Sequence, residues 1–241
     1  MTLSAAIQAW CNAWSPPDVD AGMAHKIRDE FCRIHPTLER IDTNELIAIL
    51  DSTTDRWLPQ LFVADILSRH EDFNSTLMVP LLRAAIANPD PSSNRDFLTP
   101  CLKSFGSEKV VNWLARSFVD APLLTRIGIA NLVYHLRYEP VDFNELRRRR
   151  AKGIATEAWV ESHAIDSSPL TDLIVKAASS TDNLIELYFY RQALSDMPEL
   201  LKGVPRDAME LERAIAGQPQ YERLLYDDLN WTRIADNPDR G

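Results

Sequence analysis

The chain has 241 residues, of which 45% are apolar, 15 are Pro and only 7 are Gly, and its formal net charge is −9. This length accommodates one large domain or two small ones, and the scarcity of Gly favours a helical globular protein over a turn-rich β protein. Residues 157–241 hold 8 basic against 16 acidic residues. This acidic end repels nucleic-acid phosphates and favours a basic partner, unless its charge only keeps the protein in solution.

The cysteines and the N-terminus indicate the compartment. Cys11, Cys32 and Cys101 are odd in number, far apart and never in a C-x-x-C pair, a pattern typical of reduced thiols in a core. No basic residue precedes the apolar part of the N-terminus, and no run approaches the roughly 18 apolar residues of a membrane span. We therefore expect a cytoplasmic protein without a membrane segment.

Three helices are predicted in the first fifty residues. Apolar residues at steps of three and four favour helices over residues 3–14, 19–34 and 38–50, the last with a break near residues 42–43. Residues 15–18 end the first helix and offer an N-cap for the second. The expected inward stripe of the second helix consists of Val19, Met23, Ile27, Phe31 and Ile34.

Residues 54–137 predict a row of short helices with almost no loop between them. The expected helices cover residues 55–70, 74–88, 94–105, 108–119 and 122–138. The first is almost wholly apolar and should be buried between its neighbours. Such tight alternation predicts antiparallel helix pairs stacked in a right-handed α–α superhelix, an α-solenoid whose usual product is an extended binding surface.

Within this row, residues 57–136 resemble HEAT repeats. The second half of such a repeat contains an Asp, a downstream Arg and a closing Leu and Gly. The residues of this chain that match them are Asp90, Arg95, Leu98, Leu102 and Gly106. Pro80 lies in the preceding helix, where HEAT-type repeats often have a kinking Pro, while Pro100 and Phe105 stand where the pattern has a small residue and Leu. The resemblance implies about two to three repeats of HEAT-like architecture.

After residue 140 the helical pattern becomes less regular. The expected helices begin near residues 143, 167, 181 and 220, the first of them running past Trp159 toward His163 and the last ending near residue 235. Terminal repeats are atypical because they cover an open edge of the core. We therefore expect a single all-helical domain, in which residues 1–140 form the regular solenoid and residues 141–241 form a less regular, acidic cap.

The sequence contains no assembled reactive group. Its five His form no H-E-x-x-H or H-x-x-x-H pair, and His163 would point about 200° away from Glu161 on an ideal helix. No G-x-S-x-G elbow and no Gly-rich phosphate loop occurs. We therefore predict no metal, no cofactor and no catalytic residue, which favours a protein that is not an enzyme.

Two charged features allow a structural and a functional interpretation. Asp65 falls in the almost wholly apolar helix, where a carboxylate needs a partner, and Arg69, four residues on, is the local candidate. The alternative is a carboxylate on an inner binding surface.

Arg147 to Arg150 fan through about 300° of a helix, so they cannot all meet one ligand. Arg147 and Arg150 share a face and are either solvated or in contact with an anion or an acidic protein.

Candidate binding residues are aromatic side chains beside the predicted core stripes, the arginine pair and acidic residues of the C-terminal part. Trp, Tyr and Arg are enriched at protein interfaces, although core packing is the competing interpretation for most of the aromatic residues. The candidates are Arg147, Arg150, Tyr188, Tyr190, Tyr226, Asp227, Asp228 and Trp231.

The sequence predicts a non-enzymatic module that binds a partner protein through the solenoid surface, either as an adaptor or as an acidic inhibitor of the immunity-protein kind. The HEAT-like resemblance also allows an enzyme, since DNA glycosylases of the alkylation-repair type and bilin lyases have such folds. Trp57, Asp65 and Trp113 could serve a glycosylase, but a sequence pI of about 5.1 makes nucleic acid an unexpected partner. No residue matches the lyases. A structural subunit of a larger assembly is the third alternative.

Overall fold

The chain is all-α in its computed structural model, which describes residues 1–14, 19–52, 57–70, 73–88, 93–138, 143–155, 165–195, 197–202, 204–205 and 207–215. No strand occurs among these residues, so the all-α prediction is confirmed. The chain divides into two compact units. Unit 1 comprises Met1–Ala85 and Asp96–Gly106, and unit 2 comprises Ile86–Arg95 and Ser107–Gly241. The boundary expected near residue 140 falls within unit 2.

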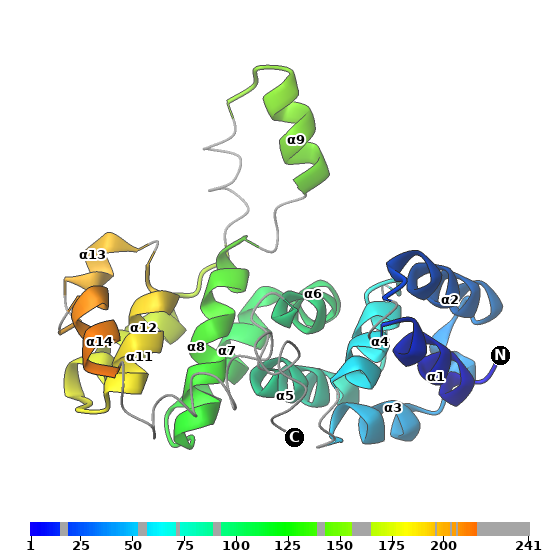
Figure 1. Cartoon of the computed structure of the whole chain (residues 1–241), viewed down its shortest axis with the longest axis horizontal. Coiled ribbons are helices and arrows are strands. Elements are labelled where there is room, and N and C mark those ends of the chain that lie inside the picture. Colours follow the sequence, from blue (N-terminus) through cyan, green and yellow to red (C-terminus); the bar gives the residue numbers. More distant parts are fainter. Residues whose placement is uncertain are drawn as a thin grey trace. The chain divides into compact units, whose positions relative to one another are not determined.

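Short helices fill most of the described parts of both units (Figure 1). Those wholly or mostly in unit 1 are α1 (Leu3–Ala13), α2 (Ala21–Ile34), the 3₁₀ helix η1 (Leu38–Arg40), α3 (Thr43–Leu50), α4 (Leu58–Leu67), the 3₁₀ helix η2 (Ser75–Leu77), α5 (Met78–Ala87) and α6 (Asn94–Phe105). Those in unit 2 are α7 (Ser107–Phe118), α8 (Leu123–Tyr138), α9 (Phe143–Ala151), α11 (Ser168–Ser180), α12 (Leu184–Ala193), α13 (Pro198–Leu201) and α14 (Ala208–Ile215). Several consecutive helices pack as pairs, among them α1 with α2, α3 with α4, and α11 with α12.

Helix α4 lies at the centre of the N-terminal part of unit 1, where it contacts α1, α2 and α3 (Figure 1). Phe62 on α4 is completely buried. Its ring packs edge-on against Trp10 of α1 and Phe31 of α2, with ring centroids 5.3 and 5.7 Å apart. Such aromatic pairs add to the free energy gained by burying their apolar surface. The prediction that this apolar helix is buried between its neighbours is confirmed.

Helix α2 differs from its prediction in both its cap and its inward face. The Asp20 carboxylate accepts a hydrogen bond of 2.8 Å from the Met23 N–H and so caps the helix, whereas the expected cap segment, residues 15–18, lies outside the described residues. Ala24 and Phe31 are the buried members of the helix. Three members of the expected inward stripe are instead 54%, 47% and 38% exposed: Val19, Met23 and Ile34. The prediction was wrong for these three, because α2 turns only a narrow face toward its packing neighbours α1 and α4.

Helix α4 is shorter than the predicted span of residues 55–70. It begins at Leu58, and Pro59 occupies its first turn, where a missing N–H donor has no helical partner to lose. Residues 53–56, which include the expected caps, lie outside the described residues. The helix ends at Leu67, after which the Ser68 hydroxyl donates a hydrogen bond of 2.7 Å to the Asp65 carbonyl.

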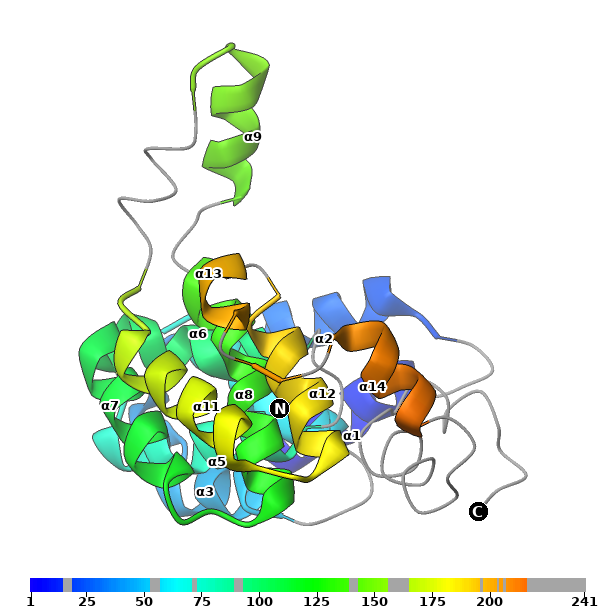
Figure 2. The same ribbon diagram turned by 90° about the vertical axis from the view of Figure 1, so that its left-hand side faces the viewer.

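Unit 2 is organised around α8 and α12 (Figure 2). Helix α12 contacts α8, α11 and α14, and α11 also contacts α7 and α8. Part of the core between them is a buried apolar cluster formed by Ile127, Ile185, Phe189 and Ile215. At Gly128 of α8 the Ile86 carbonyl comes so near that a Cβ would lie 2.1 Å from its oxygen. Only glycine fits this position.

Helix α9 ends at Ala151, so the predicted continuation past Trp159 toward His163 is wrong. Gly153 has a φ of +66°, in the left-handed region that glycine adopts without strain. The N–H groups of Gly153 and Ile154 donate 3.0 Å hydrogen bonds to the carbonyls of Arg150 and Arg149. This pair of bonds is a Schellman motif, which terminates the helix. Residues 156–164 and the helix expected over 220–235 lie outside the described residues.

Candidate functional site

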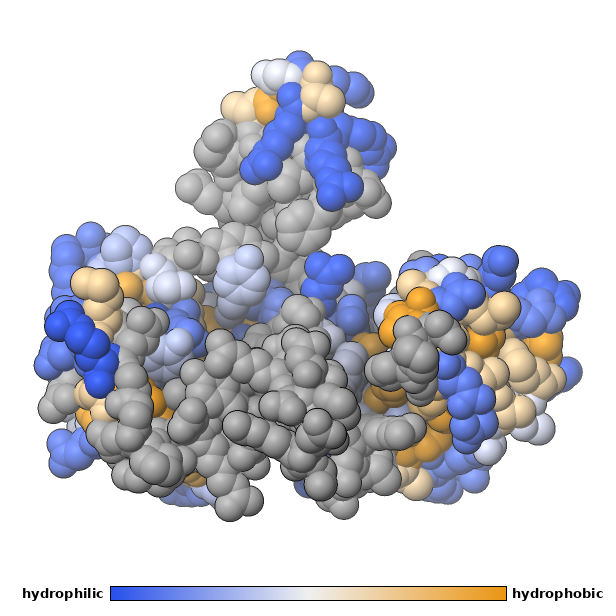
Figure 3. All heavy atoms as spheres, in the orientation of Figure 1, coloured by the Kyte–Doolittle hydropathy of each residue, from blue (hydrophilic) through white to orange (hydrophobic). Residues whose placement is uncertain are grey.

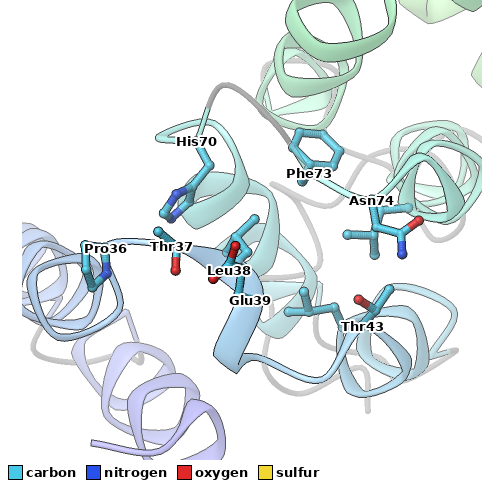
Figure 4. Close-up of a pocket in the computed structure, with 10 residues that line it drawn as sticks. Pro36, Thr37, Leu38, Glu39, Thr43, His70, Phe73 and Asn74 are labelled. Carbon is cyan, nitrogen blue, oxygen red and sulfur yellow. The ribbon is translucent and has the colours of Figure 1, made fainter.

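A cavity of about 600 Å³ lies in unit 1, where two interruptions of the helical pattern meet (Figure 4). One side comes from Pro36, the η1 helix and the first turn of α3, and the other side comes from His70 and the residues that lead into η2. Helix η2 packs against α3. The cavity is therefore built by the short connections between helices rather than by the helix faces themselves.

The floor of the cavity is apolar and fixed by the core. Leu46 of α3 and Leu77 of η2 line it, and each is only 1% exposed. Phe73 forms part of the wall and makes a T-shaped contact with Phe105 of α6, with 5.1 Å between the ring centroids. These side chains lose little conformational freedom when a ligand binds, because the core already holds them.

Polar side chains stand at the rim. Thr37, Glu39 and Asn74 are exposed, and Thr43 is half-buried. The Oδ1 atom of Asn74 accepts hydrogen bonds from the N–H and the hydroxyl of Thr76, at 3.0 and 2.9 Å. These bonds fix the orientation of the Asn74 side chain at the start of η2 and assign its NH₂ group as the remaining donor.

His70 is the half-buried titratable group of the cavity, and Figure 4 shows its ring pointing toward Thr37 from the connection that follows α4. Burial lowers the pKa of His70 from its ordinary value of 6.5, because removal of water disfavours the charged imidazolium. The imidazole is therefore neutral at pH 7, with one nitrogen that donates and one that accepts. Together with Glu39 and the threonine hydroxyls, it offers several hydrogen bonds above an apolar floor, the usual composition of a binding pocket.

The partner of Asp65 differs from the prediction. Its Oδ2 atom accepts a hydrogen bond of 3.0 Å from Nη1 of Arg28 on α2, while Arg69 instead approaches Asp29, with 3.8 Å between Nη2 and Oδ1. The Arg28 guanidinium also bonds Asp29 at 2.9 Å through Nε. The prediction of Arg69 as the partner was wrong, because α2 packs across α4 and brings an arginine from 37 residues away.

Tyr190 is completely buried in unit 2, which agrees with the core-packing interpretation of this candidate rather than with a role at the surface. Its hydroxyl donates a hydrogen bond of 3.0 Å to Oε1 of Glu186, which is itself only 3% exposed. The same carboxylate accepts from Nε of Arg126 at 2.6 Å and from the Thr181 hydroxyl at 2.7 Å. These bonds compensate the burial of the charge. Burial of the Tyr190 hydroxyl raises its pKa, and the neighbouring Glu186 carboxylate raises that pKa further. The group is a structural network between α8 and α12.

The other candidate binding residues are distributed over unit 2. Tyr188 is half-buried against the apolar cluster, and its hydroxyl accepts a hydrogen bond of 2.7 Å from Gln192. Arg147 and Arg150 are exposed on α9. The remaining candidates lie outside the described residues: Tyr226, Asp227, Asp228 and Trp231. Of the residues considered for a glycosylase, Trp57 and Asp65 belong to unit 1 and Trp113 to unit 2.

The described part of the chain contains no group of three His, Cys, Asp or Glu side chains placed to hold a metal ion. None of the three cysteines takes part in a disulfide bond. Cys101 is completely buried, which raises the pKa of its thiol and disfavours the reactive thiolate. Among the described helices, none combines the length and the apolar character needed to cross a bilayer.

A scan against protein-family models, a search of curated proteins and a search of solved structures each gave no match. The site therefore has to be interpreted from its own residues. The cavity was not predicted from the sequence, because its lining comes from two connections about 30 residues apart. Each connection by itself has the composition of an ordinary helix boundary. The available signal was the cluster of polar and aromatic residues at the second boundary, where His70, Phe73 and Asn74 follow the apolar helix within seven residues of its end at Leu67.

Proposed function

We propose that the protein is a non-enzymatic protein-binding module and that the cavity of unit 1 receives a segment of the partner protein. The observation that supports this proposal most directly is the apolar floor of Leu46 and Leu77 beneath a rim of hydrogen-bonding side chains. An apolar side chain of the partner fits the floor, and its neighbouring main-chain groups meet His70, Asn74 and the threonine hydroxyls.

The size of the cavity supports an anchor of this kind. A volume of about 600 Å³ lies within the range of roughly 300 to 1,000 Å³ that is typical of ligand pockets. Buried anchor residues in such pockets carry most of the binding free energy at protein interfaces. The exposed rim residues Thr37 and Glu39 leave the cavity open to solvent, so a polypeptide chain can cross it.

The partner is basic where it meets this rim. Glu39 is the acidic group of the lining, and the chain as a whole carries a net charge of −9. Complementary charge accelerates association and makes it sensitive to salt. Both an adaptor and an acidic inhibitor that covers a basic enzyme are consistent with this chemistry.

We further propose that the packed helix pairs form a HEAT-like right-handed superhelix. The pairing of α1 with α2, α3 with α4, and α11 with α12 supports this architecture. A crystal structure of the full chain tests it directly. A continuous superhelical stack is the expected result, and two independently packed bundles without a common superhelix axis would contradict it.

A site-specific photocrosslink tests the binding site. A photoreactive benzoylphenylalanine replaces Thr37 at the rim in one protein and replaces Asp120 in a second protein; Asp120 is an exposed turn residue of unit 2. In native cell extract, the Thr37 position should crosslink one partner, and unlabelled wild-type protein should compete it away. The Asp120 position should not crosslink this partner.

Charge reversal provides the matched measurement on the purified partner. Glu39→Lys and Asp120→Lys change the net charge equally, but only the first alters the rim. We expect Glu39→Lys to weaken binding about fivefold or more at low salt, and Asp120→Lys to leave it within about twofold. Equal effects of the two substitutions, or equal crosslinking at the two positions, would argue against the cavity as the docking site.

A further inference from the structure

We propose that α9 is a second contact surface and that it binds a short acidic segment of a partner protein in which carboxylates alternate with other residues. Residues 143–155 contain four Arg and Lys152 against a single acidic residue, Glu145, which gives a net charge of +4 in a chain of net charge −9. Arg147 and Arg150 are exposed, and Figure 3 shows hydrophilic side chains gathered over α9. This basic surface belongs to unit 2, whereas the cavity belongs to unit 1.

The helix presents Arg147 and Arg150 as a pair with defined spacing. Residues three positions apart on a helix share a face, with about 5–6 Å between their Cβ atoms. The Schellman motif at Gly153 fixes the last turn, since the N–H groups of Gly153 and Ile154 bond the carbonyls of Arg150 and Arg149 at 3.0 Å. Cations in the last turn also interact favourably with the helix dipole, so this end of α9 is stabilised by the residues that carry the charge.

An extended acidic segment matches this spacing. Along an extended chain, side chains two residues apart project to the same side and are separated by about 6.6 Å, twice the rise of roughly 3.3 Å per residue. Two carboxylates at such positions can each meet one guanidinium, and guanidinium groups bind carboxylates through two parallel hydrogen bonds. The preferred segment therefore has the pattern acidic-x-acidic.

The charge of the rest of the chain favours a short acidic segment over nucleic acid. Because the whole chain carries −9 and residues 143–155 carry +4, the other residues carry −13. A helix of nine residues is about 14 Å long, whereas a DNA duplex carries about one charge per 1.7 Å over its whole length. A duplex therefore extends beyond α9 and meets the negative charge of the remaining protein. A peptide of a few residues does not.

The test uses the full-length protein and two fluorescent peptides of identical composition. One peptide, Ala-Glu-Ala-Glu-Ala-Glu-Ala, has its three carboxylates two residues apart and on one side of an extended chain. The other, Glu-Ala-Ala-Glu-Ala-Ala-Glu, has neighbouring carboxylates three residues apart, on opposite sides of the chain. Fluorescence anisotropy at 50 mM salt should give tighter binding of the alternating peptide by about threefold or more, since only it can engage both arginines at once. A 20-base-pair duplex of DNA serves as the competing polyanion.

Matched variants assign the binding to α9. Arg147→Glu with Arg150→Glu should weaken binding of the alternating peptide at least about tenfold. Lys103→Glu with Arg116→Glu makes the same charge change at exposed residues near the ends of α6 and α7 and should weaken it less than about threefold. Far-ultraviolet circular dichroism confirms that each variant is folded.

Four outcomes would overturn the proposal. They are no detectable binding of the alternating peptide, equal affinity for the two peptides, equal loss in the two double variants, and tighter binding of the DNA duplex than of either peptide. The cavity proposal is tested separately, because Glu39→Lys lies outside α9 and should leave binding of the alternating peptide within about twofold.

Discussion

Arg28 of α2 and Asp65 of α4 form an ion pair with 3.0 Å between Nη1 and Oδ2, and their side chains are only 11% and 22% exposed. The two residues are 37 positions apart in the sequence. Because each charge has lost much of its contact with water, each depends on the other for compensation. The pair therefore links α2 to α4 and fixes how the two helices are positioned against each other.

Replacement of Asp65 should be more costly than replacement of its sequence neighbour Arg69. Asp65→Ala leaves the mostly buried Arg28 with only the exposed Asp29 as a partner, so we expect a loss of about 1–3 kcal/mol in the free energy of unfolding. Arg69→Ala removes only a contact of 3.8 Å between exposed side chains and should change this free energy by less than about 1 kcal/mol. Urea titration followed by tryptophan fluorescence measures both, and equal losses would contradict the assignment of Arg28 as the partner.

Gly128→Ala should destabilise unit 2. A Cβ at this position would lie 2.1 Å from the Ile86 carbonyl oxygen, and since that oxygen belongs to the main chain, the backbone has to move. We expect a loss of about 2–3 kcal/mol in thermal or urea unfolding. Gly22→Ala in α2 is the matched control, because its nearest contact is a side-chain atom of Asp20 at 3.3 Å and alanine favours the helix. Should Gly128→Ala prove as stable as Gly22→Ala, the close approach of the Ile86 carbonyl would be wrong.

The buried hydroxyl of Tyr190 should matter more than the half-buried hydroxyl of Tyr188. Tyr190→Phe removes a hydrogen bond to the buried Glu186 carboxylate, and we expect a loss of about 1–2 kcal/mol in the free energy of unfolding. Tyr188→Phe removes a bond of 2.7 Å to the side chain of Gln192, in which Tyr188 is the acceptor, and should cost less than about 0.5 kcal/mol. Chemical denaturation of the two variants checks the difference, which should vanish if Tyr190 is on the surface.

His70 should make the stability of unit 1 dependent on pH in the weakly acidic range. Burial lowers the pKa of His70 below its ordinary value of 6.5, so the unfolded chain binds the proton more readily than the folded protein. The neutral His70 therefore makes its full contribution to the free energy of unfolding above pH 6.5. This contribution is lost as the pH falls from 6.5 through the lowered pKa of the folded state.

The variant His70→Gln should remove this dependence. The difference in unfolding free energy between wild type and His70→Gln, measured at several pH values between 7.5 and 5, isolates the contribution of this imidazole from that of other groups. We expect the wild type to lose stability relative to the variant as the pH falls. A difference that stays constant over this range would show that the imidazole is fully solvated.

The interruptions between helices could be predicted from the sequence, since Pro, Gly and capping side chains act locally. The expected span of α6 matches the structure, and the predicted break before α3 coincides with Asp42, whose carboxylate caps that helix at the Asn44 N–H. The end of α9 was missed because the pattern of apolar residues continues beyond it, whereas Gly153 adopts the left-handed conformation that stops the helix. Local chemistry thus set most of the helix boundaries.

The candidate site was not predicted, because it depends on contacts between distant residues. His70 and Thr37 belong to separate connections that meet only when η2 packs against α3. The inward face of α2 was misassigned for the same kind of reason. Periodicity identified an apolar stripe with Met23 and Phe31, but the positions of α1 and α4 determine which part of that stripe is buried.

The amino-acid sequence by itself determined the all-α class, most of the short helices described within the first 138 residues and the uneven charge, because helix propensity, capping and net charge are properties of local sequence. Tertiary structure alone decided that Asp65 pairs with Arg28 rather than Arg69, that Tyr190 is buried against Glu186 and that a cavity forms beside His70. Burial and pairing depend on which helix lies opposite, and the packing of helices follows from the sum of many weak contacts across the chain rather than from any one segment.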